Sequence, residues 1–301
     1  MPSYLETINR ILVREAARHP ELTQFGENIA QGSRICGLAR NLGGRVVTVG
    51  NCENTHVGTG IGMMLEGGQA LLVVKQLDFL LLAMDQMVNT MNLIRATREE
   101  SSLGSFTILT IVCDQGWQGP QSSFNDLAGV CSLARVDGYF LNGQADSERV
   151  LTRQLVKPGF RLIAVSQRRF GEECLELPLL EKGCRGEACF QYADGPDATV
   201  AAFGFALPSA LEVSAAWRAQ GKRSSVYALN PVLPHDWTGV LASAARTRRL
   251  IVLDDGKGAL SLAHKLASAV LRAAPDCHVS VETRECDYQS VVNEDRFAGA
   301  A

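Results

Sequence analysis

Short apolar runs rich in β-branched residues alternate with longer segments in which apolar residues recur every three or four positions. The short runs predict strands and the longer segments predict helices. In the first part of the chain we predict strands at 45–50, 70–75, 106–112 and 161–166, and helices at 57–66, 77–98 and 146–156. In the second part we predict strands at 198–205, 224–230, 249–255 and 278–283, and helices at 207–219, 235–247 and 258–273. This alternation is typical of parallel α/β layers.

Residues 170–195 lose the pattern, because charged residues of both signs and glycines follow one another without a sustained period. We therefore predict a linker at 170–195 between two three-layer α/β domains with parallel or mixed sheets, at 1–169 and 196–301. The first 20 residues contain acids and lack a small-residue cleavage site after an apolar stretch. They predict an amphipathic helix rather than a signal peptide.

Composition narrows the class of protein. The chain has 301 residues, of which 46% are hydrophobic and 20% charged, so it can form two packed cores. A net charge of -3 offers no basic field for nucleic acid or anionic lipid. The most apolar region, 57–84, is interrupted by Glu66, Lys75 and Asp78, which argues against a membrane span. Nine cysteines without a CxxC pair, and only five histidines, indicate no metal site and a reducing cytoplasm.

One short stretch carries candidate chemistry. "NCENTHVGTGIGMMLEGG", residues 51–68, places Glu53 alone in an uncharged, glycine-rich start of a predicted helix. The "GTGIGMM" part lacks the third glycine of a dinucleotide-binding loop, because Met63 stands there. The sequence also lacks the P-loop, GxSxG and HExxH patterns. Taken alone, Glu53 fits a carboxylate that faces the positive end of a helix dipole.

Flanking motifs change this interpretation. They appear in the order "GEN" (26–28), "CENTHVGTGIGMMLEG" (52–67), "LDFLLLAMDQMVN" (77–89), "VYALNPVLPHDW" (226–237) and "LIVLDDGKGALSLAHKLA" (250–267). Their order and spacing resemble the β subunit of 2-oxo acid dehydrogenase E1 components and, more widely, the transketolase-like thiamine diphosphate enzymes. The resemblance covers nearly the whole chain. It implies a pyrimidine-binding domain followed by a transketolase C-terminal-like domain.

The resemblance also implies roles for residues in the first domain. The family glutamate at the position of Glu53 lies against N1′ of the cofactor's aminopyrimidine ring, where a shared proton helps the cofactor lose its C2 proton. Phe79 matches the aromatic residue that packs on this ring, and Gly58 belongs to the glycine-rich helix start beside it. Glu27 matches an acid near the thiazolium end. The alternatives are core burial for Phe79 and a capping or solvated carboxylate for Glu27.

Three further positions bear on the substrate. Gln121 stands where the family carries a histidine, and glutamine cannot act as an acid or base near neutral pH. Gln121 therefore implies a changed carbonyl partner or weak activity. His56 could replace the missing histidine, although an ordinary helix-start histidine is an alternative. Arg168 falls near the arginine that binds a substrate phosphate in transketolases, and a surface charge is an equal alternative.

The sequence contains no GDG motif, with which this family holds the diphosphate and Mg²⁺ on a separate domain. The resemblance therefore implies an α-type partner subunit that carries that domain, and an α2β2 heterotetramer with contacts between β subunits. We expect a split thiamine diphosphate enzyme that cleaves or forms a C–C bond next to a carbonyl and transfers a ketol or acyl unit. The small-molecule donor would be a ketose or a 2-oxo acid. The alternatives are an E1 β subunit and a non-catalytic subunit that kept the fold.

Overall fold

The computed structural model describes residues 2–114, 125–257 and 261–284. The chain divides into two compact units. The first contains described residues 2–114 and 130–176, and the second contains 125–129 and the described residues from 177 onward. The predicted domain boundaries stay a prediction, and each unit is described by itself below.

The first unit contains a sheet of six parallel strands in the order β2-β1-β3-β4-β6-β5. Its strands are β1 (Thr23–Gly26), β2 (Arg45–Thr48), β3 (Gln69–Val74), β4 (Ser105–Val112), β5 (Asp137–Phe140) and β6 (Gly159–Ser166). Its α-helices are α1 (Tyr4–Ala17), α2 (Glu53–Leu65), α3 (Met91–Thr97) and α5 (Gln144–Gln154). Helix α4 (Leu127–Ala134) contains residues of both units. Short 3₁₀ turns lie at η1 (Ile35–Gly37), η2 (Leu77–Ala83) and η4 (Glu100–Ser102), and η3 (Gln86–Thr90) is a π-helix.

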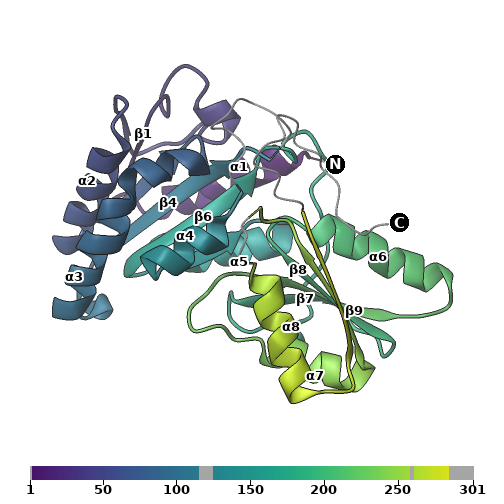
Figure 1. Cartoon of the computed structure of the whole chain (residues 1–301). Coiled ribbons are helices and arrows are strands. Elements are labelled where there is room, and N and C mark those ends of the chain that lie inside the picture. Colours follow the sequence, from purple (N-terminus) through teal and green to yellow (C-terminus); the bar gives the residue numbers. More distant parts are fainter. Residues whose placement is uncertain (1, 115–124, 258–260, 285–301) are drawn as a thin grey trace, which may run out of the picture. The chain divides into compact units, whose positions relative to one another are not determined.

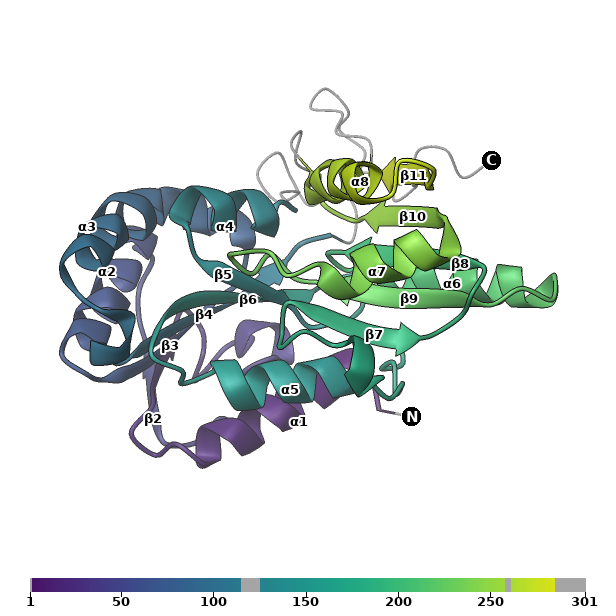
Figure 2. The same ribbon diagram turned by 90° about the horizontal axis from the view of Figure 1, so that it is seen from below.

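Helices cover both faces of this sheet (Figures 1 and 2). Helices α2 and α3 lie on one face, and α1 and α5 lie on the other. Every residue of the central strand β4 is buried, as expected for a parallel strand covered on both sides. Phe106 of β4 faces α2, whereas the hydroxyl of the next residue, Thr107, donates to the Leu155 carbonyl after α5 at 2.9 Å. The first unit is therefore a three-layer sandwich.

The second unit contains a mixed five-stranded sheet in the order β11-β10-β8-β9-β7, in which only β7 runs antiparallel to its neighbour. Its strands are β7 (Cys189–Ala193), β8 (Ala198–Phe203), β9 (Ser224–Leu229), β10 (Arg249–Asp254) and β11 (His278–Thr283). Its helices are α6 (Leu207–Ala219), α7 (Thr238–Thr247), α8 (Leu262–Ala273) and the turn η5 (Glu181–Gly183). The core beneath α7 and α8 contains Phe203, Trp237, Val252 and Leu266. The predicted α/β class with parallel and mixed sheets is confirmed.

Most predicted elements are present within a few residues of their predicted ends, including the N-terminal amphipathic helix as α1. The exception is the predicted single helix at 77–98, which is wrong in detail: the run is divided into η2, η3 and α3. Apolar spacing of three to four residues suits all three helix types, so the pattern could not distinguish them. Within 170–195, the structure places η5 and β7, and β1, β5 and α4 are additional elements.

Helix α1 shows how local sequence sets an element's start. Ser3 caps the helix, because the Glu6 N–H donates to Ser3 Oγ at 3.2 Å and the Ser3 N–H donates to a Glu6 carboxylate oxygen at 2.9 Å. The stripe of Tyr4, Ile8 and Ile11 is buried. Across the described ranges, no helix is long and apolar enough to cross a membrane.

Glycine lets α2 lie directly on the central strand. A Cβ atom on Gly60 would collide with the ring of Phe106. That ring stacks on Phe160 of β6, with centroids 5.0 Å apart, and it is fully buried. Gly62, two residues further along the same helix, is exposed and has no atom within 4 Å of such a Cβ. The two glycines therefore differ only in what they face.

We expect Gly60→Ala to lower the free energy of unfolding by about 1–3 kcal/mol, because the added methyl group overpacks the contact with Phe106. Gly62→Ala is the matched control and should raise stability by up to about 1 kcal/mol, because alanine favours the helix. Urea denaturation followed by circular dichroism measures both changes. Equal effects of the two substitutions would contradict the close approach of α2 to β4.

Candidate functional site

The carboxyl ends of the parallel strands meet at one edge of the six-stranded sheet. Glu27 directly follows β1, and Arg168 follows β6 closely. Phe79 lies in η2, shortly after β3, and Glu53 begins the helix that follows β2. Parallel strands present their following loops on the same side, so one edge of the sheet receives all of these residues. The candidate site of the first unit is this edge.

A glycine at the end of β1 allows the chain to place Glu27 at this sheet edge. Gly26 ends β1 next to β3, and a Cβ atom there would collide with the Val73 carbonyl oxygen. The chain then leads directly into Glu27, which is half-buried. Asn28 follows in a left-handed conformation with φ of 52°. The "GEN" sequence therefore turns the chain sharply at the sheet edge and holds a carboxylate there.

Glu53 is the first residue of α2 and is half-buried. A carboxylate at this position faces the unpaired N–H groups and the positive end of the helix dipole. The preceding residue, Cys52, takes the N-cap position, and its Sγ lies 2.9 Å from Thr55 Oγ1. This hydrogen bond lowers the pKa of the exposed Cys52 thiol.

Glu53 and His56 lie close enough to Glu27 to influence the charge of its carboxyl. Burial raises the pKa of the Glu27 carboxyl, and the negative charge of Glu53 raises it further. The ring of His56 acts in the opposite direction. His56 itself is buried, with 8% of its surface exposed, so it is not a surface histidine. The structure thus brings together three of the predicted site residues.

Phe79 and Gly58 lie in elements that pack against each other, since η2 and η3 both contact α2. Phe79 is half-buried in η2, so part of its ring remains accessible. Gly58 faces Gln86 of η3: a Cβ atom on Gly58 would lie 3.5 Å from Gln86 Cδ. Gly58 therefore contacts the helix layer.

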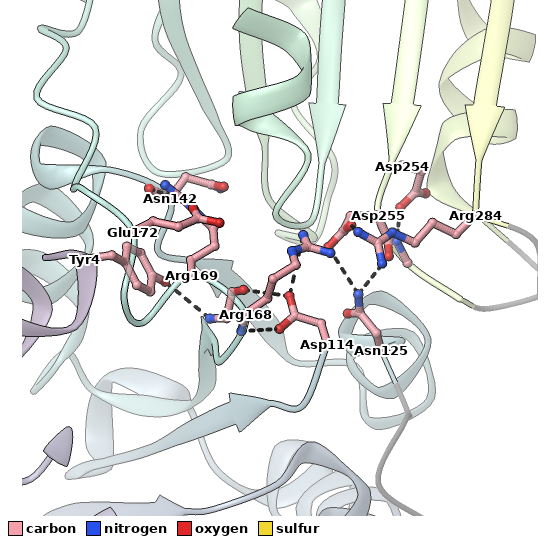
Figure 3. Close-up of polar contacts among 12 residues, drawn as sticks. Tyr4, Asp114, Asn125, Asn142, Arg168, Arg169, Glu172, Asp254, Asp255 and Arg284 are labelled. Carbon is pink, nitrogen blue, oxygen red and sulfur yellow. Dashed lines mark hydrogen bonds and ion pairs between the residues drawn. The ribbon is translucent and has the colours of Figure 1, made fainter. Parts of the chain in front are cut away.

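Arg168 is held by a buried carboxylate, Asp114, that the sequence analysis did not single out (Figure 3). Asp114 is 1% exposed and follows β4 closely. It accepts hydrogen bonds from Ser166 Oγ at 2.6 Å and from the Arg168 N–H at 2.9 Å. The Arg168 guanidinium lies 3.7 Å from Asp114 Oδ2. A lone acid two residues after the predicted strand at 106–112 was the signal that could have revealed it.

The neighbouring Arg169 has a structural role. Within the described ranges it is the largest fully buried side chain, lying over the Tyr4 ring at 4.7 Å and donating to the Asn142 carbonyl at 2.6 Å. The Tyr4 hydroxyl donates to the Leu141 carbonyl at 2.5 Å, and burial raises its pKa. Together these contacts fasten α1 to the loops after β5 and β6.

The second unit has its own buried polar group at the carboxyl end of β10 (Figure 3). Asp255 is fully buried; its carboxylate pairs with Arg284 at 2.7 Å and its carbonyl accepts from Asn125 at 2.7 Å. Asp254 accepts from Ser261 and Gly256, and burial raises the pKa of its carboxyl. Each acid has partners inside the unit, which accounts for its burial.

One predicted site residue, Gln121, lies outside the described residues. Among the residues that the structure does describe, no group of three or more His, Cys, Asp or Glu side chains could hold a metal ion.

Comparisons with known proteins test the predicted family resemblance and the fold. Residues 186–282 match the family model of the transketolase C-terminal domain. The β subunit of the pyruvate dehydrogenase E1 component from Rhizobium meliloti (strain 1021) is 24% identical over 287 residues. That alignment covers 90% of this chain and 60% of the relative. The resemblance to the transketolase-like proteins is confirmed.

Two further matches support the resemblance. The chloroplastic pyruvate dehydrogenase E1 subunit beta-3 of Arabidopsis thaliana is 31% identical over 140 residues, which cover 45% of this chain and 32% of that relative. This chain therefore spans less than two thirds of the length of both curated relatives. A solved structure described as a split-gene transketolase, an inactive β4 tetramer, matches with a TM-score of 0.68 at 16% identity. The match covers 96% of this chain and 90% of that chain, and it confirms the fold.

We expect Glu53→Gln to lower the pKa of Glu27 toward its ordinary value, because the negative charge that raises it is removed. Titration of the ¹³C-labelled side-chain carboxyl of Glu27 by NMR measures this shift. Glu66→Gln, at the opposite end of α2, is the control and should leave Glu27 unaffected. A Glu27 titration that does not respond to Glu53→Gln would show that the two acids are not neighbours.

Proposed function

We propose that this chain is the aminopyrimidine-binding component of a split thiamine diphosphate enzyme. The enzyme would cleave or form a C–C bond next to a carbonyl and transfer a ketol or acyl unit from a ketose or 2-oxo acid. The observation that carries the proposal is the meeting of Glu53, Glu27 and His56 at the start of α2. Relatives named as E1 β subunits support the same class of chemistry.

The residues present fit the aminopyrimidine end of the cofactor. A half-buried carboxylate at a helix start, Glu53, suits a ring nitrogen that carries a proton, and the half-buried ring of Phe79 suits a flat heterocycle. When bound, the cofactor would supply a nucleophilic carbon and an electron sink. The lack of a GDG motif in the sequence places the diphosphate and Mg²⁺ site of this proposal on another polypeptide.

In this proposal Glu53 would share a proton with N1′ of the ring. Its half-buried position at the start of α2, near Glu27, supports this role. Glu27, whose carboxyl pKa is raised by burial, would lie at the thiazolium end of the site. Phe79 and Gly58 would exclude water and shape the wall beside the ring.

Arg168 would bind an anionic group of the substrate, since a guanidinium matches phosphate and carboxylate. His56 would supply the acid–base function that Gln121 cannot, and its place beside Glu27 supports this assignment. Gln121 would hydrogen-bond a substrate oxygen. The E1 β subunit of a 2-oxo acid dehydrogenase is the alternative function, favoured by the names of the curated relatives.

An α-type subunit with a GDG domain would hold the diphosphate and Mg²⁺ and complete an α2β2 assembly in the cytoplasm. Exposed leucines support the assembly of this chain with other subunits. Leu81 and Leu82 of η2 and Leu93 of α3 are exposed, and they lie on helices that cover the same sheet as the candidate site. Exposed apolar side chains on these helices would suit a contact with another subunit.

We expect Glu53→Gln to lower turnover of the reconstituted enzyme roughly 100-fold or more, because the amide cannot share a proton with N1′. Sedimentation should show unchanged assembly with the partner. Glu66→Gln, in the same helix but away from the site, should retain full turnover. Normal turnover in the Glu53→Gln enzyme would remove Glu53 from the mechanism and refute the proposed function.

Calorimetry separates the enzyme from a non-catalytic subunit. Thiamine diphosphate with Mg²⁺ should release heat on mixing with the α–β pair and none on mixing with this chain alone, because the diphosphate needs the partner's groups. Binding by this chain alone would contradict the split site. No binding by the assembled pair would favour a subunit that kept the fold without the chemistry.

A further inference from the structure

The helical run after β3 changes type at Gln86. A 3₁₀ segment, η2, ends at Ala83, and the π-helix η3 extends from Gln86 to Thr90. Helix α3 begins at the next residue, Met91. A π-helix has a wider turn than an α-helix and is rare, and it occurs frequently at functional sites. Such a break needs a compensating contact, and the side chain of Gln86 provides one.

Both the nitrogen and the oxygen of the Gln86 side-chain amide form hydrogen bonds. Its Nε2 donates to Asn54 Oδ1 at 3.3 Å, and its Oε1 accepts from the Thr90 hydroxyl at 2.9 Å. Thr90 closes the π segment, so the second bond spans that segment from its first residue to its last. With acceptor and donor both engaged, the amide has one defined orientation.

Gln86 lies over one face of α2. Asn54 and Gly58 are four residues apart and so share a helix face. A Cβ atom on Gly58 would lie 3.5 Å from Gln86 Cδ and 3.7 Å from Gln86 Nε2. The amide therefore rests on the glycine at ordinary contact distance while it bonds to the first turn. Without a side chain at Gly58, the amide has room to reach Asn54.

The first turn of α2 gains from such a contact, because its own cap is weak. The N-cap residue is Cys52, whose Sγ contacts Thr55 Oγ1 at 2.9 Å, and sulfur is a weaker hydrogen-bonding atom than the oxygens of the favoured caps Ser, Thr, Asp and Asn. Glu53 stands on this turn, next to Asn54. A bond from outside the helix to Asn54 therefore restrains the residue beside the proposed catalytic carboxylate.

We propose that Gln86 is a positioning residue for Glu53, acting through Asn54 to hold the first turn of α2. The proposal rests on the proposed role of Glu53 and adds no contact between Gln86 and cofactor or substrate. Proton sharing depends on the placement of the carboxylate within a fraction of an ångström. The π-helix is the feature that brings Gln86 to this position.

The test uses Gln86→Met, which keeps the length of the side chain and removes both hydrogen bonds. In the full chain alone, amide hydrogen exchange at residues 53–58 should become about three- to tenfold faster, as expected for the loss of one hydrogen bond. In the reconstituted enzyme, kcat should fall by a similar factor while KM for the carbonyl donor stays unchanged. Asp85→Asn is the matched control, because Asp85 is exposed and bonds only to Asn89 along its own helix among the contacts seen here.

A double-mutant cycle with Asn54→Ala locates the effect. If Gln86 acts through Asn54, the double variant should be no slower than the slower single variant. Fully additive losses, or unchanged exchange and kcat in Gln86→Met, would overturn the positioning role. If Glu53→Gln abolishes turnover while Gln86→Met does not change it, the positioning role fails and the proposed function stands. If Glu53→Gln retains full turnover, the proposed function fails first.

Discussion

The contact between α2 and the central strand β4 determines where the candidate site can form. Gly60 lets the helix lie against Phe106, and this contact fixes the axis along which α2 points. The first residue of that helix, Glu53, then lies at the sheet edge that also receives Glu27. A larger residue at the contact would lift the helix and move the carboxylate with it. The packing of α2 against β4 therefore also sets the position of the Glu53 carboxylate.

Two acids at one helix start would ordinarily repel each other. The helix dipole favours charge on Glu53, whereas burial and the charge of Glu53 disfavour charge on Glu27. The Glu27 carboxyl therefore holds a proton more readily than an ordinary glutamate. Carboxyls of this kind are common at sites that move protons. His56, buried beside them, adds a ring that can donate or accept a hydrogen bond.

The sequence predicted the elements that follow from hydrophobic periodicity. It did not predict the features that depend on contacts between distant residues. Strand β4 was evident, because a short run of apolar and β-branched residues is typical of a strand covered on both faces. The division of residues 77–98 could not be predicted, because η2, η3 and α3 share similar apolar spacing. They differ only through contacts with neighbours such as Asn54. The proximity of Glu27 to Glu53 depends on the pairing of β1 with β2 and on α2, which no single motif encodes. Asp114 was missed because its meaning depends on Ser166 and Arg168, far away in the sequence.

A crystal structure of the chain assembled with its α-type partner, thiamine diphosphate and Mg²⁺ tests the central claim most directly. The account predicts a Glu53 carboxylate oxygen within hydrogen-bonding distance of N1′ of the aminopyrimidine ring. A Glu53 side chain that faces bulk water, or that pairs with a lysine away from the ring, would contradict it.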